Sequence, residues 1–180
     1  MKPAQNNLAY IDGANLHRGV KELGWELDYA RFRVWLREKY GVSIAYIFIG
    51  LIPKYKDLYT DLQRAGYVLV FKETTLNGEG IPKGNCDADL VLRAVRDVFE
   101  TMYGSAVLIS SDGDYASLVS FLQEKGKMRA ILAPHNKCSI LLKRTNVPIT
   151  YLDSVRGHVQ KGPKTEKAPG GDGTPQGSSS

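Results

Sequence analysis

Four aspartates stand where they can act together on a phosphate group through a bound metal ion: Asp12, Asp87, Asp112 and Asp114. The first follows a short apolar run at 8–11, the last two follow another at 106–109, and the second begins a long amphipathic segment. Carboxylates that lie close together repel one another unless a cation lies between them. Because ligand sets made of oxygen alone suit Mg²⁺ or Mn²⁺ rather than zinc, these acids predict a Mg²⁺ or Mn²⁺ site. Such a metal can activate water for phosphodiester hydrolysis.

Each of these aspartates also has an ordinary structural interpretation. Asp87 and Asp114 occupy positions typical of helix N-caps, where aspartate is favoured. Asp12 and Asp112 each precede a glycine, and Asp-Gly is a common turn dipeptide. The convergence of three strand-to-helix corners at one sheet edge favours the metal site over four independent structural roles.

Helical spacing distinguishes Asp87 from its neighbour Asp89. Asp87 shares a helix face with apolar residues, including Ala94, and is therefore expected to point toward the sheet. Asp89 lies four residues before Arg93, the spacing of a surface ion pair. Asp87 is accordingly the predicted site residue.

Short apolar runs alternate with amphipathic segments along the chain. Strands are expected at 8–11, 44–49, 67–71, 106–109, 129–133 and 149–152. Helices are expected at 16–23, 29–39, 56–65, 87–102, 115–125 and 139–143. Five glycines suit the left-handed position that ends a helix: Gly24, Gly41, Gly66, Gly104 and Gly126. This alternation predicts a three-layer α/β/α sandwich with a mainly parallel sheet, of the Rossmann-like type.

Composition indicates one soluble domain, expected over residues 1–158 and in the cytoplasm. Apolar residues make up 43% of the chain, and the formal charge is +5, which suits a phosphate-rich partner. The sequence contains no apolar stretch long enough to span a membrane, and none typical of a signal peptide. Residues 162–180 lack Val, Ile, Leu, Met and aromatic side chains, so 159–180 is expected to be a disordered tail. The connection at 72–86 is long and glycine-containing, as functional loops often are.

Three segments together resemble the NYN domain family, a branch of the PIN-like nucleases, with LabA-like bacterial proteins the closest group. They are IDGANL at 11–16, KGNCDADL at 83–90 and SSDGDY at 110–115. The resemblance covers about residues 8–153 and implies a PIN-like parallel sheet with a Mg²⁺- or Mn²⁺-dependent ribonuclease site. By motif it places the four aspartates at the family's acidic metal site. It also implies substrate contacts by Asn15, Lys83 and Ser110, products with a 5′ phosphate, and a possible homodimer.

The leading hypothesis is therefore a metal-dependent ribonuclease that cuts single-stranded or structured RNA. An RNA-binding or regulatory module with a slow or silent PIN-like site is the alternative. Asn15 has a second interpretation, in which its side chain only closes the turn. Three tyrosines, Tyr55, Tyr59 and Tyr67, lie near basic residues and suggest a surface that stacks unpaired bases, although Tyr59 also fits a helix core.

Overall fold

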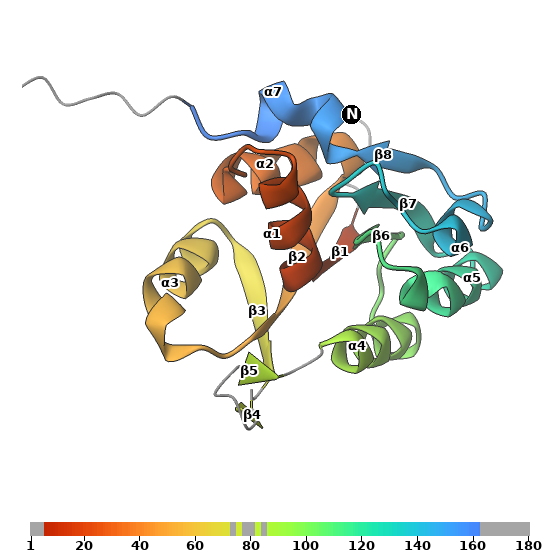
Figure 1. Ribbon diagram of the computed structural model, residues 1–180. Helices are drawn as coiled ribbons and strands as arrows, with labels where there is room; N and C mark the ends of the chain where they lie inside the picture. Colours follow the sequence, from red (N-terminus) through yellow and green to blue (C-terminus); the bar gives the residue numbers. More distant parts are fainter. Residues whose placement is uncertain (1–5, 73–74, 77–81, 84–85, 163–180) are drawn as a thin grey trace, which may run out of the picture.

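Six parallel strands form the centre of the molecule (Figure 1). The computed structural model describes residues 6–72, 75–76, 82–83 and 86–162. The strands are β1 (Asn7–Asp12), β2 (Val42–Gly50), β3 (Tyr67–Lys72), β6 (Ala106–Ile109), β7 (Met128–Ala133) and β8 (Ile149–Tyr151). Their order is β3-β2-β1-β6-β7-β8, and every pairing among them is parallel. The predicted strands are confirmed, and the sheet is wholly rather than mainly parallel.

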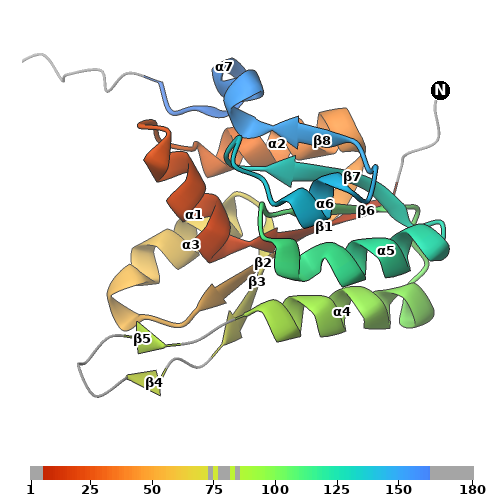
Figure 2. The same cartoon turned by 45° about the vertical axis from the view of Figure 1, so that its right-hand side comes forward.

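Helices cover both faces of this sheet and complete the predicted sandwich. On one face lie α1 (Gly13–Glu22), α2 (Tyr29–Tyr40) and α3 (Lys56–Arg64), which share a buried apolar core with the strands. On the other lie α4 (Asp87–Glu100), α5 (Ala116–Glu124) and α6 (Ile140–Lys143), which share a second core. Figure 2 shows α4 and α5 running side by side along that second face. The architecture is the α/β sandwich of the PIN-like fold.

Several short elements carry no periodic signal in the sequence. The 3-10 helices are η1 (Pro53–Tyr55), η2 (Gly113–Tyr115) and η3 (Leu152–Val155). Within the connection at 72–86, β4 (Thr75–Leu76) pairs antiparallel with β5 (Pro82–Lys83); residues 73–74, 77–81 and 84–85 lie outside the described residues. After β8 the chain forms α7 (Arg156–Val159), whose Val159 is wholly buried in the first core. Packed structure therefore continues past residue 158, while 163–180 of the predicted tail lie outside the described residues.

Four of the five helix-ending glycines adopt the predicted left-handed conformation, and Gly104 does not. Helix α4 ends at Glu100, so Gly104 lies in the connection that leads to β6. A Cβ there would come within 2.6 Å of the Asn7 side-chain oxygen. Gly104 is thus required by close packing against the start of β1, not by a positive φ.

A buried charge anchors α4 to the sheet. Asp97 is 3% exposed, and it accepts hydrogen bonds from Tyr10 Oη of β1 at 2.9 Å and from Arg93 Nε at 3.0 Å. The Arg93 guanidinium lies over the Tyr46 ring, 4.3 Å from its centroid, and also donates to the Tyr46 hydroxyl. These contacts fix the position of α4, and with it Asp87 at the start of that helix.

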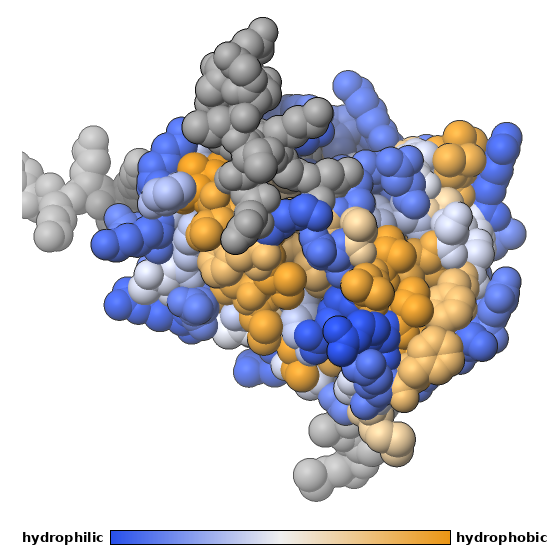
Figure 3. Space-filling model, turned by 90° about the horizontal axis from the view of Figure 1, so that it is seen from below, coloured by the Kyte–Doolittle hydropathy of each residue, from blue (hydrophilic) through white to orange (hydrophobic). Residues whose placement is uncertain are grey.

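The sheet edge at β3 leaves apolar side chains at the surface. Val68 of β3 and Leu92 of α4 are exposed. Figure 3 views the molecule from the side on which these elements lie and shows apolar residues gathered there.

None of the helices in the described part of the chain has the length and apolar character required to cross a membrane.

Candidate metal and phosphate site

The strand register brings two of the predicted acids to one point of the sheet. Ile11 of β1 pairs with Ile109 of β6, so Asp12 and the loop after β6 leave the sheet side by side. The strand order reverses between these two strands, and open α/β sheets bind their ligands at such a switch point, beyond the carboxyl ends of the strands. The start of α4 lies at the same edge, because its first residue, Asp87, accepts a hydrogen bond from Tyr115, which follows the loop after β6.

Three of the four predicted acids form a cluster. Asp87, Asp112 and Asp114 each offer a carboxylate oxygen, and these oxygens lie within 4.8 Å of one another. Asp114 is exposed, whereas the other two are half-buried. Asp12, the fourth predicted acid, lies beside this group rather than within it. The structure therefore brings together acids from the motifs at 83–90 and 110–115. The acid of the motif at 11–16 lies next to them.

The connection between Asp12 and the cluster is a tyrosine hydroxyl. Tyr115, whose side chain is wholly buried, donates to Asp87 Oδ1 at 2.7 Å and to Asp12 Oδ2 at 3.1 Å. Burial and the nearby carboxylates raise the pKa of Tyr115 far above its usual value, so the hydroxyl is always a donor. The sequence prediction took residue 115 only as the first residue of a helix. Its position directly after Asp112-Gly113-Asp114 is the feature of the sequence that could have indicated a place beside the acids.

The N-cap assignments expected for the acids are reversed. Asp12 and Asp112 are the caps, and they accept hydrogen bonds from the backbone N–H of Asn15 and Asp114, both at 3.0 Å. Asp87 is instead the first residue of α4, after Cys86, and Asp114 lies inside η2. The reason is that Asp12 and Asp112 have extended backbone directly before a helical turn, so their side chains can accept from the free N–H groups of that turn.

Two polar side chains set the shape of the turns around these acids. Asn15 Oδ1 accepts from both the backbone N–H and the hydroxyl of Ser111 at 3.0 Å, which ties α1 to the loop after β6. Ser110 is wholly buried, and its hydroxyl accepts from the Asp112 N–H at 3.1 Å. Asn15 lines the pocket described below, whereas Ser110 is not among the described residues that line it. Ser110 therefore positions Asp112 from behind.

Burial shapes the titration of two groups at this site. It raises the pKa of Asp12, and the carboxylates of Asp87 and Asp112 raise it further, against the opposing hydrogen bonds from Asn15 and Tyr115. Burial also raises the pKa of the Cys86 thiol to about 11, so this cysteine is neutral near pH 7. Cys86 is thus a small buried residue at the start of α4 and not a thiolate nucleophile.

Asp89 and Lys83 belong to the same motif as Asp87, at residues 83–90. Asp89 forms an ion pair with Lys72 at 3.0 Å, and not the predicted pair with Arg93, which binds Asp97 instead. The helical spacing was correct, but Lys72 at the end of β3 and the buried Asp97 are the nearer partners. The backbone of Lys83 belongs to β5, while its side chain lies outside the described residues.

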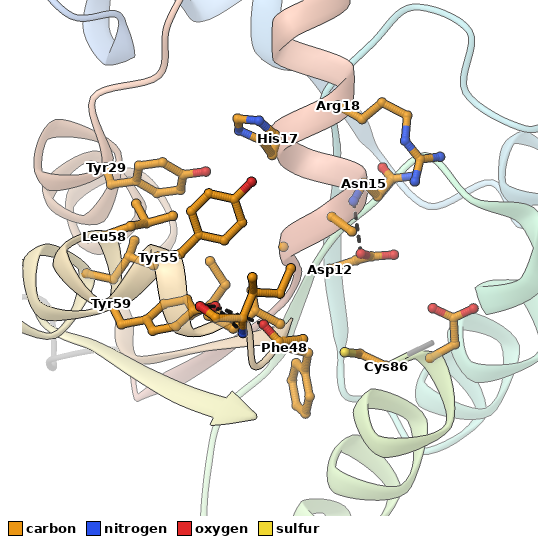
Figure 4. A pocket seen from close by; sticks show the side chains of 18 of the residues that line it. Asp12, Asn15, His17, Arg18, Tyr29, Phe48, Tyr55, Leu58, Tyr59 and Cys86 are labelled. Carbon is orange, nitrogen blue, oxygen red and sulfur yellow. Dashed lines mark hydrogen bonds between the residues drawn. The ribbon is translucent and has the colours of Figure 1, made fainter. Parts of the chain in front are cut away.

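A pocket of about 700 Å³ extends from the acids along α1 (Figure 4). Asp12, Asp87 and Asp112 lie at one end of it. Its walls come from α1 and from the segment between β2 and α3, which includes Tyr55. Of the three tyrosines predicted to stack unpaired bases, Tyr55 alone is exposed. Tyr59 and Tyr67 are buried and donate their hydroxyl hydrogen bonds to backbone atoms.

The acidic cluster fits a hard divalent cation. Its donors are carboxylate oxygens from three residues, and one of the three side chains is open to solvent. Small divalent ions such as Mg²⁺ bind through one or a few carboxylates and complete their coordination with water or substrate phosphates. The residues present can therefore hold such an ion.

The chain belongs to the NYN domain family, whose model matches residues 8–152. It is also similar to a solved crystal structure of a protein of unknown function, VPA0982 from Vibrio parahaemolyticus RIMD 2210633. The two share 20% sequence identity with a TM-score of 0.72, and the match covers 89% of this chain and 99% of that one. No curated protein matches the sequence. The resemblance seen in the three motifs is thus confirmed at the level of family and fold.

Proposed function

We propose that the protein is a Mg²⁺- or Mn²⁺-dependent ribonuclease that hydrolyses phosphodiester bonds of RNA. The observation that carries this proposal is the cluster of Asp87, Asp112 and Asp114 oxygens within 4.8 Å, at the switch point of a sheet in an NYN domain. Carboxylates this close repel one another, and a divalent cation bound among them would relieve that repulsion.

The proposed roles divide between holding an ion and holding the acids. Asp87, Asp112 and Asp114 bind the ion, and Asp12 supports it from the side. A divalent ion in this position supplies an acidified water and offsets charge on the phosphate. Tyr115 keeps Asp12 and Asp87 oriented through its two hydrogen bonds, and the Asn15–Ser111 contact sets the separation of the two turns. Substrate contacts by Asn15 and Lys83 are part of the proposal.

Cleavage of 5′-labelled single-stranded RNA tests the proposal. The purified protein is assayed with Mn²⁺ or Mg²⁺, with EDTA, and as Asp112→Asn. An asparagine at 112 still accepts the Asp114 N–H, so the turn keeps its cap while one carboxylate is lost. Asp61→Asn is the matched control, because Asp61 is an exposed acid on α3 whose side chain is 75% accessible.

The expected result is metal-dependent cleavage that both EDTA and Asp112→Asn abolish and that Asp61→Asn retains. Cleavage that survives Asp112→Asn overturns the assignment, since the acid cluster would then not be the site of reaction. RNA binding without any cleavage, with either metal, identifies instead the binding module with a silent site.

A further inference from the structure

The part of the pocket wall formed by α1 carries positive side chains, in contrast to the acids. The side formed by α1 carries His17, Arg18 and Lys21, all exposed. Within the part of the chain that the structure describes, Arg18 and Lys21 have no carboxylate partner. Two positive side chains next to three carboxylates give the pocket wall both signs of charge. Such a site suits a ligand that carries several phosphates, of which one lies at the acids and another along α1.

The opposite wall is aromatic and apolar. Tyr55 and Leu58 line the pocket yet are 42% and 41% exposed, and Tyr29 closes the wall behind them. Figure 4 shows His17, Tyr29 and Tyr55 directed toward the same space, with Arg18 reaching from α1 toward the side of Asp12 and Asn15. Lys54 lies 5.0 Å from the centroid of the Tyr55 ring. Apolar rings that face a concavity with a few polar groups around it are typical of small-molecule and base-binding pockets.

We propose that this pocket binds one unpaired nucleotide of an RNA strand, next to the phosphate that the acids address. Its base lies against Tyr55 and Leu58, and its phosphate lies beside Arg18. A base in this pocket has left its helical stack, so the site selects single-stranded RNA over duplex. The inference rests on the proposed ribonuclease function for its choice of ligand, and it adds the substrate class and the residues that recognise it.

Binding of short RNA in EDTA tests the pocket without any hydrolysis. The probes are a 5′-fluorescein octauridine, a labelled octamer with the same backbone and abasic sugars throughout, and a labelled duplex of the same length. Fluorescence anisotropy gives the affinity of each. The variants are Tyr55→Leu, which removes the ring, and Tyr55→Phe, which keeps it. Phe99→Leu is the matched control, because Phe99 is an aromatic residue on α4, 70% exposed and outside the pocket lining.

The wild type is expected to bind octauridine about 5- to 160-fold more tightly than the abasic octamer, the range that one stacked base supplies. Tyr55→Leu should remove most of that difference, whereas Tyr55→Phe and Phe99→Leu should retain it. Arg18→Gln should weaken both single-stranded probes equally and reduce the slope of log affinity against log salt by about 1. Equal affinity for octauridine and its abasic counterpart, equal affinity for the duplex, or no effect of Tyr55→Leu overturns the proposal.

The two proposals fail in different ways. Base-dependent binding that needs Tyr55, from a protein that cuts nothing in Mn²⁺, supports the pocket and refutes the ribonuclease. Metal-dependent cleavage that proceeds at the same rate and with the same KM in Tyr55→Leu refutes the pocket and supports the ribonuclease.

Discussion

Replacing Tyr115 with phenylalanine removes one oxygen atom, yet it changes the surroundings of two carboxylates. The hydroxyl donates to Asp87 at 2.7 Å and to Asp12 at 3.1 Å, and Asp12 is 8% exposed. Hydrogen bonds to charged groups are each worth about 1.5–3 kcal/mol, and here one proton serves both acceptors. We therefore expect Tyr115→Phe to lower the free energy of unfolding by about 2–3 kcal/mol in EDTA, or Tm by about 4–12 °C.

A bound divalent ion should reduce this cost. The hydroxyl stabilises the folded state by offsetting the negative charge of Asp12 and Asp87, and a cation at the acidic cluster offsets part of the same charge. With saturating Mg²⁺ we expect the loss to fall to about half its value in EDTA, because the two stabilising effects overlap. By linkage, the variant should gain more stability from Mg²⁺ than the wild type does.

Urea denaturation with and without Mg²⁺ measures both quantities, and Tyr59→Phe is the matched control. Tyr59 is also a buried tyrosine, but its hydroxyl bonds to the backbone of Gly50 and Ile52. Its loss should cost about 1 kcal/mol whether or not Mg²⁺ is present. A loss for Tyr115→Phe below about 0.5 kcal/mol in EDTA, or one that Mg²⁺ leaves unchanged, would refute this account of the hydroxyl.

Two further predictions concern buried acids. In EDTA at pH 7, Asp12→Asn should melt at a higher temperature than the wild type. The raised pKa of Asp12 means that its negative charge destabilises the folded state, and an asparagine removes this charge while it still accepts the Asn15 N–H. The folded wild type then takes up a proton more readily than the unfolded chain, so its stability rises as pH falls from 7 through the folded pKa toward the ordinary value of 3.8. A melting series from pH 8 to 4 should show the advantage of the variant shrinking, and an advantage independent of pH would contradict the argument. Asp97→Asn should cost about 2–3 kcal/mol, because Arg93 and Tyr10 lose a buried charged partner. Urea denaturation checks this value, and a loss close to zero would show that Asp97 does not anchor α4.

The sequence predicted those parts of the fold that depend on local patterns. Strands buried on both faces are continuous apolar runs, so β6 was placed residue for residue and β1 and β2 to within two residues at each end. The closeness of the acids that follow β1 and β6 was predicted because the carboxyl ends of parallel strands lie at one edge of a sheet. The two-residue strands β4 and β5 have no period to detect, and α7 is recognised only through the burial of Val159.

The details of the site that the sequence did not predict are contacts between distant segments. Tyr115 reaches Asp87 and Asp12 across 28 and 103 positions of the chain, and no local pattern indicates such a partner. For the same reason Asp89 was paired with Arg93, four residues away, rather than with Lys72 on another element. Local spacing identifies which side chains point outward, but the packing of α4 on the sheet decides what they meet.

The two acids that cap helical turns, Asp12 and Asp112, are each followed by a glycine whose Cβ position is crowded by neighbouring atoms. A Cβ on Gly13 would lie 2.3 Å from Ile49 Cγ2 and 2.9 Å from the carbonyl oxygen of Phe48, and one on Gly113 would lie 2.3 Å from Ser139 Oγ. Neither glycine has a positive φ, so the requirement is for space alone. The turn after Asp12 therefore packs directly against β2, and the turn after Asp112 packs against Ser139. Neither glycine offers a ligand atom, yet Gly13 belongs to the site, because a methyl group there would force the turn that carries Asp12 and the backbone of β2 apart.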